Sequence, residues 1–318
     1  MAELMQAKNR TISKKQGFGQ MLAKDFFRNK YIYIMLLPLV LYYIIFHYGP
    51  MYGAIIAFKD YNVTRGFFES KWVGFKHFQS FFNSFFFSRV LRNTILINIY
   101  QIIFGFPIPI VFAILLNELR SKVLKKTVQT VSYLPHFISV MVICGIIIDF
   151  TMKDGLLNQI IDLFGGKKAN LLMQANLFRT IFVSTNIWQN FGWESIIYIA
   201  ALTSIDLQLY ESATIDGAGR WRKMLHITLP GIMPTIVIML ILRIGRMMSI
   251  GYEKIILLYN PITYETADVI STLVYRQGLL EKNYSFSTAI GLFNSVINYL
   301  LVVSANRISR LLNETSLW

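Results

Sequence analysis

Long apolar runs alternate with shorter polar segments along most of this chain. Because about 20 apolar residues in a helix cross the hydrocarbon core of a bilayer, each run of that length predicts a membrane-spanning helix. Six runs qualify, and they cover residues 31–49, 94–117, 128–150, 179–202, 232–257 and 285–305. The pattern therefore predicts an all-α polytopic membrane protein with six transmembrane helices.

Composition supports a membrane protein and argues against other classes. The 318 residues are 54% hydrophobic and 15% charged, whereas a soluble domain is typically about one quarter charged. The net charge of +14 comes from residues scattered between the apolar runs, which favours basic loops beside a membrane over a nucleic-acid-binding face. Cys144, the one cysteine, lies inside an apolar run, so a disulfide framework and a cysteine-based metal site are both excluded.

Lysine and arginine near the run ends predict the orientation in the membrane. They are denser in the N-terminal segment, in residues 118–127, in the loop at 203–231 and in the tail, so these parts and both termini are expected to be cytoplasmic. The first apolar run is too long for a cleaved signal peptide and no small-residue cleavage site follows it. The predicted parts are a basic amphipathic N-terminal segment at 1–30, a transmembrane domain at 31–305 that includes the loop, and a tail at 306–318.

The loop at 203–231 is the most structured polar segment that the sequence predicts. Residues 207–215 suit a short helix with Ser204 or Asp206 as its N-cap, and Asp216-Gly217 is a turn signal. A second helix fits residues 219–228 before Pro230 opens the next apolar run. Such an exposed helical hairpin can dock into a soluble partner, although an ordinary loop at the membrane interface is equally compatible with the residues.

Polar side chains within the fourth run share one helical face. Asn186, Gln189, Asn190 and Trp193 recur at helical spacing, with Glu194 adjacent. Amides offer hydrogen bonds to sugar hydroxyl groups, and an indole ring offers an apolar plate to the sugar ring. The residues therefore predict part of a substrate path, but interhelical hydrogen bonds without any substrate also explain them.

Two arginines in the fifth run need a polar environment. An arginine at the centre of a membrane helix costs about 2.5–3.5 kcal/mol, so Arg243 and Arg246 are expected to face protein, water or a carboxylate. Their spacing places them on nearly the same helical face. Arg243 has two readings: an ion pair with Glu194, or a site for an acidic sugar. Other polar or small residues that could line the same cavity are Ser249, Gly251, Tyr252, Asn294 and Asn298.

The loop at 203–231 resembles the EAA loop of ABC importer permeases. The resemblance rests on Glu211-Ser212-Ala213, on Asp216-Gly217-Ala218 and on Ile227-Thr228-Leu229-Pro230, with Ser212 in place of the usual alanine. Four further segments resemble the polysaccharide branch of the maltose-like sugar permeases: Trp72-Val73-Gly74, Tyr259-Asn260-Pro261, Tyr264-Glu265-Thr266-Ala267-Asp268 and Ser316-Leu317-Trp318.

This resemblance implies a type I ABC importer permease fold in a bacterial cell membrane. In that family the EAA loop fits a groove on a cytosolic ATPase dimer, so Glu211 is expected to meet a basic residue there while Gly217 makes the turn. The coupling residues implied are Glu211, Ala213, Asp216, Gly217, Ala218, Arg220, Leu229 and Pro230. The chain lacks a GxxxxGK[ST] motif, so ATP and Mg are expected on the ATPase subunit, and this chain binds no cofactor or metal of its own.

The family also implies partners and a cargo. They are a second, homologous permease, an extracellular solute-binding protein and a carbohydrate, with substrate contacts on the helix that precedes the loop. Neutral and acidic oligosaccharides both stay open, as does a non-sugar solute. An enzyme is disfavoured because the four histidines are isolated and no paired-carboxylate spacing occurs. A secondary transporter would need coupling-ion carboxylates or an inverted repeat, and neither is evident.

Overall fold

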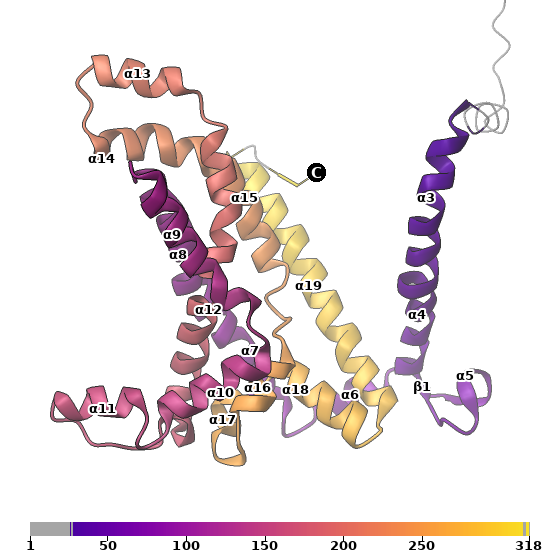
Figure 1. Ribbon diagram of the computed structural model, residues 1–318. Helices are drawn as coiled ribbons and strands as arrows, with labels where there is room; N and C mark the ends of the chain where they lie inside the picture. The colour runs from indigo at the N-terminus through magenta and orange to yellow at the C-terminus, as the bar shows by residue number, and fades with distance from the viewer. Residues whose placement is uncertain (1–25, 27, 314–315, 318) are drawn as a thin grey trace, which may run out of the picture. The chain divides into compact units, whose positions relative to one another are not determined.

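The computed structural model describes residues 26, 28–313 and 316–317. Almost all of the predicted N-terminal segment at 1–30 therefore lies outside the described residues. The chain divides into two compact units, one that ends at Ile55 and one that runs from Ile56 to Trp318, and each is described by itself (Figure 1).

The first unit is dominated by one apolar helix. It comprises α3 (Lys30–Tyr43), a π-helical turn η1 (Ile44–Tyr48) and α4 (Gly49–Met51), and the 3₁₀ segment η2 (Tyr52–Phe58) leads into the second unit. No residue of α3 is buried. A helix of this length that is apolar on all sides is suited to lipid contact, so this segment agrees with the first predicted span.

The second unit contains four long helical stretches and many short helices. The first, Phe87–Asn117, joins α7 (Phe87–Tyr100), η3 (Gln101–Gly105) and α8 (Pro107–Asn117), and the second is α12 (Ala175–Thr203). The third, Arg220–Ile244, joins α14 (Arg220–Lys223), η6 (Met224–Thr228) and α15 (Leu229–Ile244), and the fourth is α19 (Tyr284–Asn313). The shorter α-helices are α5 (Gly66–Glu69), α6 (Lys76–Phe82), α9 (Lys122–Tyr133), α10 (Val140–Thr151), α11 (Leu156–Leu163), α13 (Leu207–Ile215), α16 (Tyr252–Leu258), α17 (Tyr264–Ala267) and α18 (Ile270–Tyr275).

The remaining regular segments are single turns and one small sheet. The turns are η4 (Leu134–Phe137), η5 (Leu171–Met173), η7 (Pro261–Thr263) and η8 (Arg276–Leu280). Strands β1 (Lys59–Asp60) and β2 (Lys71–Trp72) pair antiparallel, with Lys59 opposite Trp72. This pair is an addition to the predicted all-α fold, and it is too small to change the fold class.

The span count differs from the simple six-run prediction at two places, the third and the fourth predicted spans. Four described helices are long and apolar enough to cross a membrane, and a fifth span is formed if the bent pair Lys122–Phe137 and Val140–Leu163 counts as one. The predicted third span is therefore not one straight helix, because the chain bends by 99° after Phe137. The 29-residue α12 has the length of a span, but polar side chains in its middle lower its hydropathy.

The predicted fifth span at 232–257 is too long. Helix α15 ends at Ile244, and residues 245–251 form turns and irregular backbone before α16 begins. Apolar residues resume within and beyond this segment, at Met247, Met248 and Ile250 and from Ile255, so average hydrophobicity alone could not locate the helix end. The break determines where Arg246, Ser249 and Tyr252 lie.

Close helix packing positions the middle of α12. A Cβ atom added at Gly192 would lie 2.2 Å from the backbone oxygen of Ser132, so only glycine allows α9 to approach α12 this closely. Helix α12 also packs along α8 and α15, where Ile110, Tyr198 and Ile232 belong to one buried apolar cluster. The polar face of α12 is thereby held between several helices.

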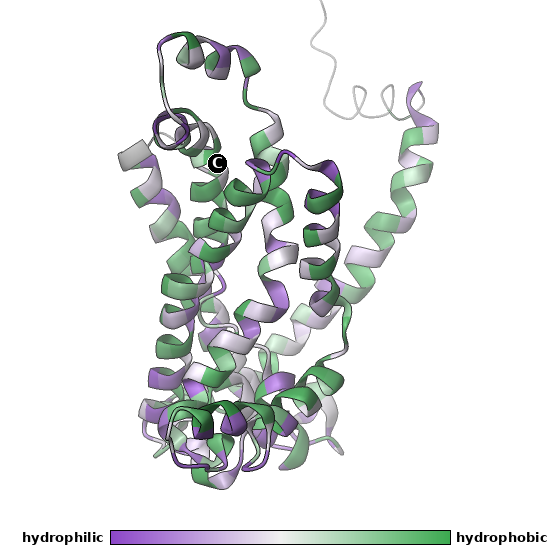
Figure 2. Ribbon diagram, turned by 60° about the vertical axis from the view of Figure 1, so that its left-hand side comes forward, coloured by the Kyte–Doolittle hydropathy of each residue, from purple (hydrophilic) through white to green (hydrophobic). Residues whose placement is uncertain are grey.

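The two ends of the second unit differ. Helices α13 and α14 form a hairpin at one end, whereas α11, α16, α17 and α18 gather at the opposite end (Figure 1). Hydrophobic residues predominate along the long helices, and hydrophilic residues are more frequent towards the helix ends and loops (Figure 2). This distribution matches that of a multi-pass membrane protein.

Candidate functional site

The hairpin of α13 and α14 has the local structure that the sequence predicts. Helix α13 covers Leu207–Ile215 and begins after Asp206, whose Oδ1 accepts a hydrogen bond from the backbone N–H of Gln208 at 2.9 Å. Gly217 has a φ of 73°, a left-handed conformation that glycine adopts without steric cost. The second helical stretch then runs from Arg220 to Thr228. The predicted helices and turn are confirmed.

Side-chain hydrogen bonds join the two arms of this hairpin. Lys223 Nζ donates to Thr214 Oγ1 at 2.7 Å, and the hydroxyl groups of Tyr210 and Thr228 lie 2.9 Å apart. The second arm continues into α15 through Leu229 and Pro230, so Arg220–Ile244 is one helix of 25 residues. The second arm of the hairpin is thus continuous with a membrane-length helix.

The hairpin presents uncovered apolar and charged side chains. Leu207, Ile215 and Trp221 are 72%, 87% and 74% exposed. Glu211 is exposed and makes no ion pair with any residue that the structure describes. A cavity of about 350 Å³ on the hairpin is lined by Ala213, Asp216, Ala218, Arg222, Lys223, His226 and Ile227. Exposed large apolar side chains gathered on a rigid element mark an interaction surface.

A second functional candidate is a cavity of about 400 Å³ between α7, η3, α12 and α15, called the inner cavity here. Its lining residues are Asn98, Gln101, Phe106, Asn186, Glu194, Tyr198, Met239, Leu242, Arg243, Arg246 and Ser249. The structure therefore brings together Asn186, Glu194, Arg243 and Arg246, which the sequence predicts for the substrate path. Amides, a carboxylate and two guanidinium groups give the inner cavity the chemistry of a polar-ligand site.

The two arginines of the inner cavity have different environments. Arg243 Nη1 donates to both carboxylate oxygens of Glu194, at 3.0 and 3.1 Å, so the expected ion pair is confirmed. Helix α15 ends at Ile244, and Arg246 consequently lies in the turn that follows. Arg246 is exposed and has no ion-pair partner among the described residues. One guanidinium group is thus left in excess over carboxylates in this cavity.

Three predicted path residues of α12 face other helices instead. Gln189 is 8% exposed, and its Oε1 accepts a hydrogen bond from Lys254 Nζ at 3.2 Å. Asn190 Oδ1 lies 2.9 Å from His136 Nδ1, and the Trp193 ring stacks on His136 with centroids 4.7 Å apart. None of the three lines the inner cavity, because these positions on α12 turn towards η4 and α16.

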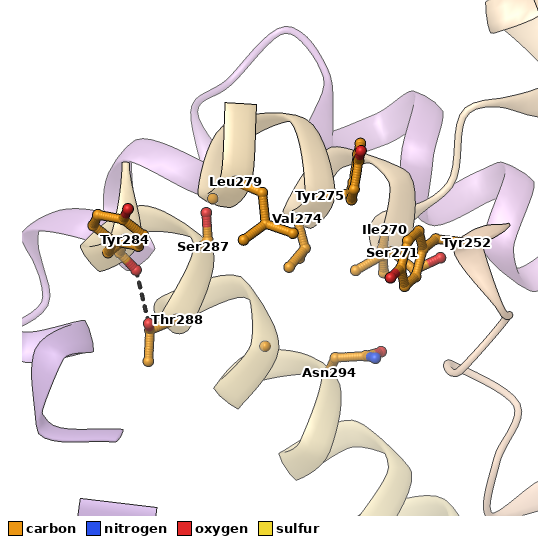
Figure 3. Close-up of a pocket in the computed structure, with 12 residues that line it drawn as sticks. Tyr252, Ile270, Ser271, Val274, Tyr275, Leu279, Tyr284, Ser287, Thr288 and Asn294 are labelled. Atoms are coloured by element: carbon orange, nitrogen blue, oxygen red, sulfur yellow. Dashed lines mark hydrogen bonds between the residues drawn. The ribbon is translucent and has the colours of Figure 1, made fainter. Parts of the chain in front are cut away.

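The break after α15 moves other predicted residues away from the inner cavity. Tyr252 and Asn294 line a separate cavity of about 440 Å³, in which Tyr252 lies beside Ile270 and Ser271 at one end and Tyr284 lies at the other (Figure 3). Gly251 is the N-cap residue of α16. Asn298 Oδ1 accepts a hydrogen bond from the backbone N–H of Met248 at 2.9 Å, and its Nδ2 donates to Ser249 Oγ at 2.8 Å. Asn298 is not among the residues that line the cavity of Asn294.

Sequence reasoning missed several residues around α12. Lys254 is 8% exposed within an apolar environment, and a lysine inside a long apolar run was a usable signal for an internal partner. His136 follows Pro135 at the bend and was visible only as an isolated histidine. Tyr198, Asn98 and Gln101 line the inner cavity, but no spacing rule links residues of α7 to residues of α12.

The segment Tyr264–Asp268 supplies a buried ionic cluster. Asp268 is fully buried, accepts two hydrogen bonds from Arg276 at 2.8 Å and forms an ion pair with Arg89 at 2.9 Å. These bonds to Asp268 raise the pKa of Arg276 above its usual value. Asn93 donates to the backbone oxygen of Asp268 at 2.8 Å. This Asp268 cluster ties α7 to α17 and α18.

Comparisons with known proteins agree with this architecture. Residues 105–314 match the family described as "Binding-protein-dependent transport system inner membrane component". The permease protein YteP of a polygalacturonan/rhamnogalacturonan transport system of Bacillus subtilis (strain 168) is 42% identical over 308 residues, which cover 96% of each chain. Protein LplB of the same organism is 42% identical over 292 residues, which cover 92% of each chain.

Solved structures give the same result. A chain in the crystal structure of a bacterial ABC transporter involved in the import of the acidic polysaccharide alginate superimposes with a TM-score of 0.85 and is 44% identical. The match covers 92% of this chain and 99% of that one. A second match, with 43% identity and the same coverage, is to a bacterial alginate ABC transporter in complex with an alginate pentasaccharide-bound periplasmic protein. The chain described here therefore belongs to the family of binding-protein-dependent transport system inner membrane components and is a multi-pass membrane permease.

Proposed function

We propose that this chain is one of two permease subunits of an ATP-driven importer, and that it passes an acidic oligosaccharide through the inner cavity. The observation that carries the acidic cargo is the excess guanidinium of Arg246, which lines the cavity while Glu194 is occupied by Arg243. A guanidinium group keeps its charge when dehydrated and matches a carboxylate in a bidentate fork. The names of the relatives, which include transporters of alginate and of polygalacturonan, support the same substrate class.

In the proposed assembly this chain has three kinds of partner. A second, homologous permease completes the path, an extracellular solute-binding protein delivers the sugar, and a cytosolic ATPase dimer binds ATP and Mg. Both termini and the hairpin of α13 and α14 lie on the cytoplasmic side in this proposal. The hairpin contacts the ATPase through Glu211, which has no ion-pair partner in the described part of the chain, and through the exposed side chains of Ile215 and Trp221.

The cargo is tested by uptake into vesicles that contain the complete importer. Arg246→Gln is expected to lower uptake of an oligouronide about tenfold or more, because a hydrogen bond to a charged group contributes about 1.5–3 kcal/mol. Uptake of a neutral oligosaccharide, if the wild-type complex transports one, is expected to stay unchanged. Arg246→Lys, which keeps the charge but loses the fork, is the matched control with an intermediate loss. Equal transport of both sugars by wild type and by Arg246→Gln would contradict the acidic cargo.

A neutral oligosaccharide is the second candidate, and the Glu194–Arg243 pair favours it. An arginine that is already neutralised by a carboxylate can orient sugar hydroxyl groups without selecting for charge. The two candidates differ in Glu194→Gln, which releases Arg243 from the carboxylate. Tighter binding of uronides by this variant supports the acidic cargo. If the variant instead binds neutral sugars more weakly and its affinity for uronides does not rise, the neutral cargo is supported.

The coupling role of the hairpin is tested separately. Glu211→Lys replaces an attraction to a basic residue with a repulsion, so the assembled complex is expected to lose most of its substrate-stimulated ATP hydrolysis. Glu211→Gln removes the charge without repulsion and serves as the milder comparison. Normal stimulated hydrolysis by Glu211→Lys in a fully assembled complex would remove the hairpin from the coupling path.

A further inference from the structure

A fourth cavity, of about 550 Å³, lies along α7, η3 and α12 and is called the distal cavity here. Its lining includes Tyr100, Phe104, Asn176, Arg179, Thr180 and Ser184. These residues of α12 precede those of the inner cavity in the sequence. The distal cavity is therefore farther along α12 from the end that leads into the hairpin.

The two cavities adjoin at Gly105. A Cβ atom added at Gly105 would lie 3.3 Å from Ile187 Cγ1, which belongs to a residue of the distal cavity, and 3.5 Å from Arg243 Nη2, which belongs to a residue of the inner cavity. On α12, the lining positions of the two cavities also continue one another at spacings of three, four or seven residues, so they follow one helical stripe.

The distal cavity repeats the chemistry of the inner cavity. Arg179 Nη2 donates to Asn93 Oδ1 at 2.7 Å and Nε donates to the backbone oxygen of Thr266 at 3.3 Å, which fixes the guanidinium group at the cavity wall. These bonds use two of its five N–H donors, and Arg179 makes no ion pair within 4 Å in the described part of the chain. The cavity thus has an arginine whose charge is not matched by a contacting carboxylate.

Aromatic rings and small polar side chains complete this wall. The rings of Tyr100 and Phe104 are one helical turn apart, with centroids 6.4 Å from each other, and aromatic faces are apolar plates on which sugar rings pack. Asn176, Thr180 and Ser184 are exposed side chains of α12 that offer hydrogen-bond donors and acceptors. An arginine, aromatic plates and hydroxyl or amide groups together suit a uronic-acid residue.

We propose that the distal cavity is a second saccharide subsite, which binds one acidic sugar of a chain while another sugar of the same chain occupies the inner cavity. The proposal rests on the proposed function, because it assigns both cavities to one cargo. Arg179 and Glu194 are about four turns apart, so about 22 Å along α12, a distance that a single sugar ring cannot span. The two subsites in series therefore select for oligomers over single uronic acids.

Cysteine protection in the complete importer tests this subsite. Cys144 is the one cysteine of the chain and is buried, so Thr180→Cys gives this chain one reactive thiol, whose modification by a charged, water-soluble reagent is followed by mass spectrometry. Oligouronides of increasing length are the probes. Long oligomers are expected to slow modification at least fivefold, and a single uronic acid is expected to leave the rate unchanged. Ser80→Cys on α6, which is exposed but lines neither cavity, is the control.

The outcomes separate the two proposals. If the wild-type complex transports an acidic oligomer and that oligomer leaves the modification of Thr180→Cys unchanged, the distal subsite is overturned and the proposed function stands. If the wild-type complex transports no acidic oligomer, the proposed function itself fails.

A charge change at the same position gives an independent test. Thr180→Glu is expected to weaken binding of long oligouronides to the purified complex about tenfold and to leave the affinity for a single uronic acid within twofold. Thr180→Gln has nearly the same size as Thr180→Glu without the charge, and it is expected to weaken binding of long oligouronides clearly less than Thr180→Glu does. An equal loss of affinity at every chain length, or no loss at any length, would overturn the subsite.

Discussion

Two regions of this chain use arginine–carboxylate pairs for different purposes. In the Asp268 cluster, the carboxylate is fully buried and is shared by Arg89 and Arg276. In the inner cavity, the side chains of Glu194 and Arg243 stay 35% and 24% exposed, and Arg246 lies beside them without a carboxylate of its own. Both regions have two guanidinium groups and one carboxylate, but their burial differs, and only in the Asp268 cluster do both guanidinium groups contact the carboxylate.

The difference indicates which pair is structural and which is available to a ligand. A buried charge is strongly destabilising when its partner is lost, so the Asp268 cluster is expected to hold α7, α17 and α18 together. A half-exposed pair contributes little to stability because water screens it. The inner cavity can therefore exchange its internal contacts for contacts with a substrate, whereas the Asp268 cluster cannot do so without unfolding.

The largest expected effect is that of Asp268→Asn. The change leaves Arg89 and Arg276 without their carboxylate, and removing one partner of a buried ion pair typically costs about 3–5 kcal/mol. The midpoint of denaturant-induced unfolding in detergent should fall accordingly, and less folded protein should reach the membrane. Asp60→Asn, at an exposed ion pair, is the matched control. A midpoint for Asp268→Asn within error of wild type would end the assignment of the cluster as structural.

Asn93→Leu should destabilise the same cluster by a smaller amount. Asn93 is fully buried, donates to the backbone oxygens of Glu265 and Asp268, and accepts from Arg179. Each buried group left without a partner costs about 1–3 kcal/mol, so a loss of about 2 kcal/mol is expected in the same unfolding assay. Asn98→Leu, which removes an amide from the wall of the inner cavity, provides the comparison and should cost less.

Glu194→Gln should affect binding more than stability. The ion pair is partly exposed, so its loss should change the free energy of unfolding by about 1 kcal/mol or less. The affinity of the purified complex for an oligouronide should rise severalfold, because Arg243 is released to a ligand carboxylate. Isothermal titration with a single oligouronide measures this. A stability loss as large as that of Asp268→Asn would erase the distinction between the two regions.

The smallest effect is expected at the surface pair of Lys76 and Asp60. Their side chains are 57% and 54% exposed and 3.3 Å apart, and such pairs contribute about 0–1 kcal/mol. Lys76→Ala should therefore lower the free energy of unfolding by no more than about 0.5 kcal/mol. The loss should shrink further in high salt. A larger, salt-insensitive loss would show that exposure alone does not rank the ion pairs of this chain.

Much of the fold follows from local sequence signals. Runs of apolar residues predicted the helices at α3, α12 and α19, and the turn at Asp216-Gly217 was visible because a glycine tolerates positive φ. The bend after Phe137 and the end of α15 at Ile244 were missed. Both lie within predicted spans that are apolar on average despite Pro135 in one and Arg246 in the other, and average hydrophobicity gives no information on the direction of the backbone.

The sequence predicted the polar face of α12 but not which of its residues line the inner cavity. Helical spacing grouped Asn186, Gln189, Asn190 and Trp193 on one face, but the structure turns only Asn186 towards the inner cavity. The polar face of α12 is wider than the inner cavity. Asn190 and Trp193 contact His136, and Gln189 contacts Lys254. Periodicity gives the face of a helix but does not identify the helix that will cover it.

The sequence by itself determined that the chain crosses the membrane several times, that a capped helical hairpin separates two apolar runs, and that its motifs are those of an importer permease. These properties depend on neighbouring residues, and short-range spacing and side-chain chemistry are sufficient to specify them. Only the tertiary structure decided which charges are neutralised. Arg89 lies 179 residues from Asp268, and Arg243 lies 49 residues from Glu194. Helix packing determines which of these distant residues meet and how deeply each pair is buried. Burial in turn determines whether a charged group stabilises the protein or remains available to a ligand.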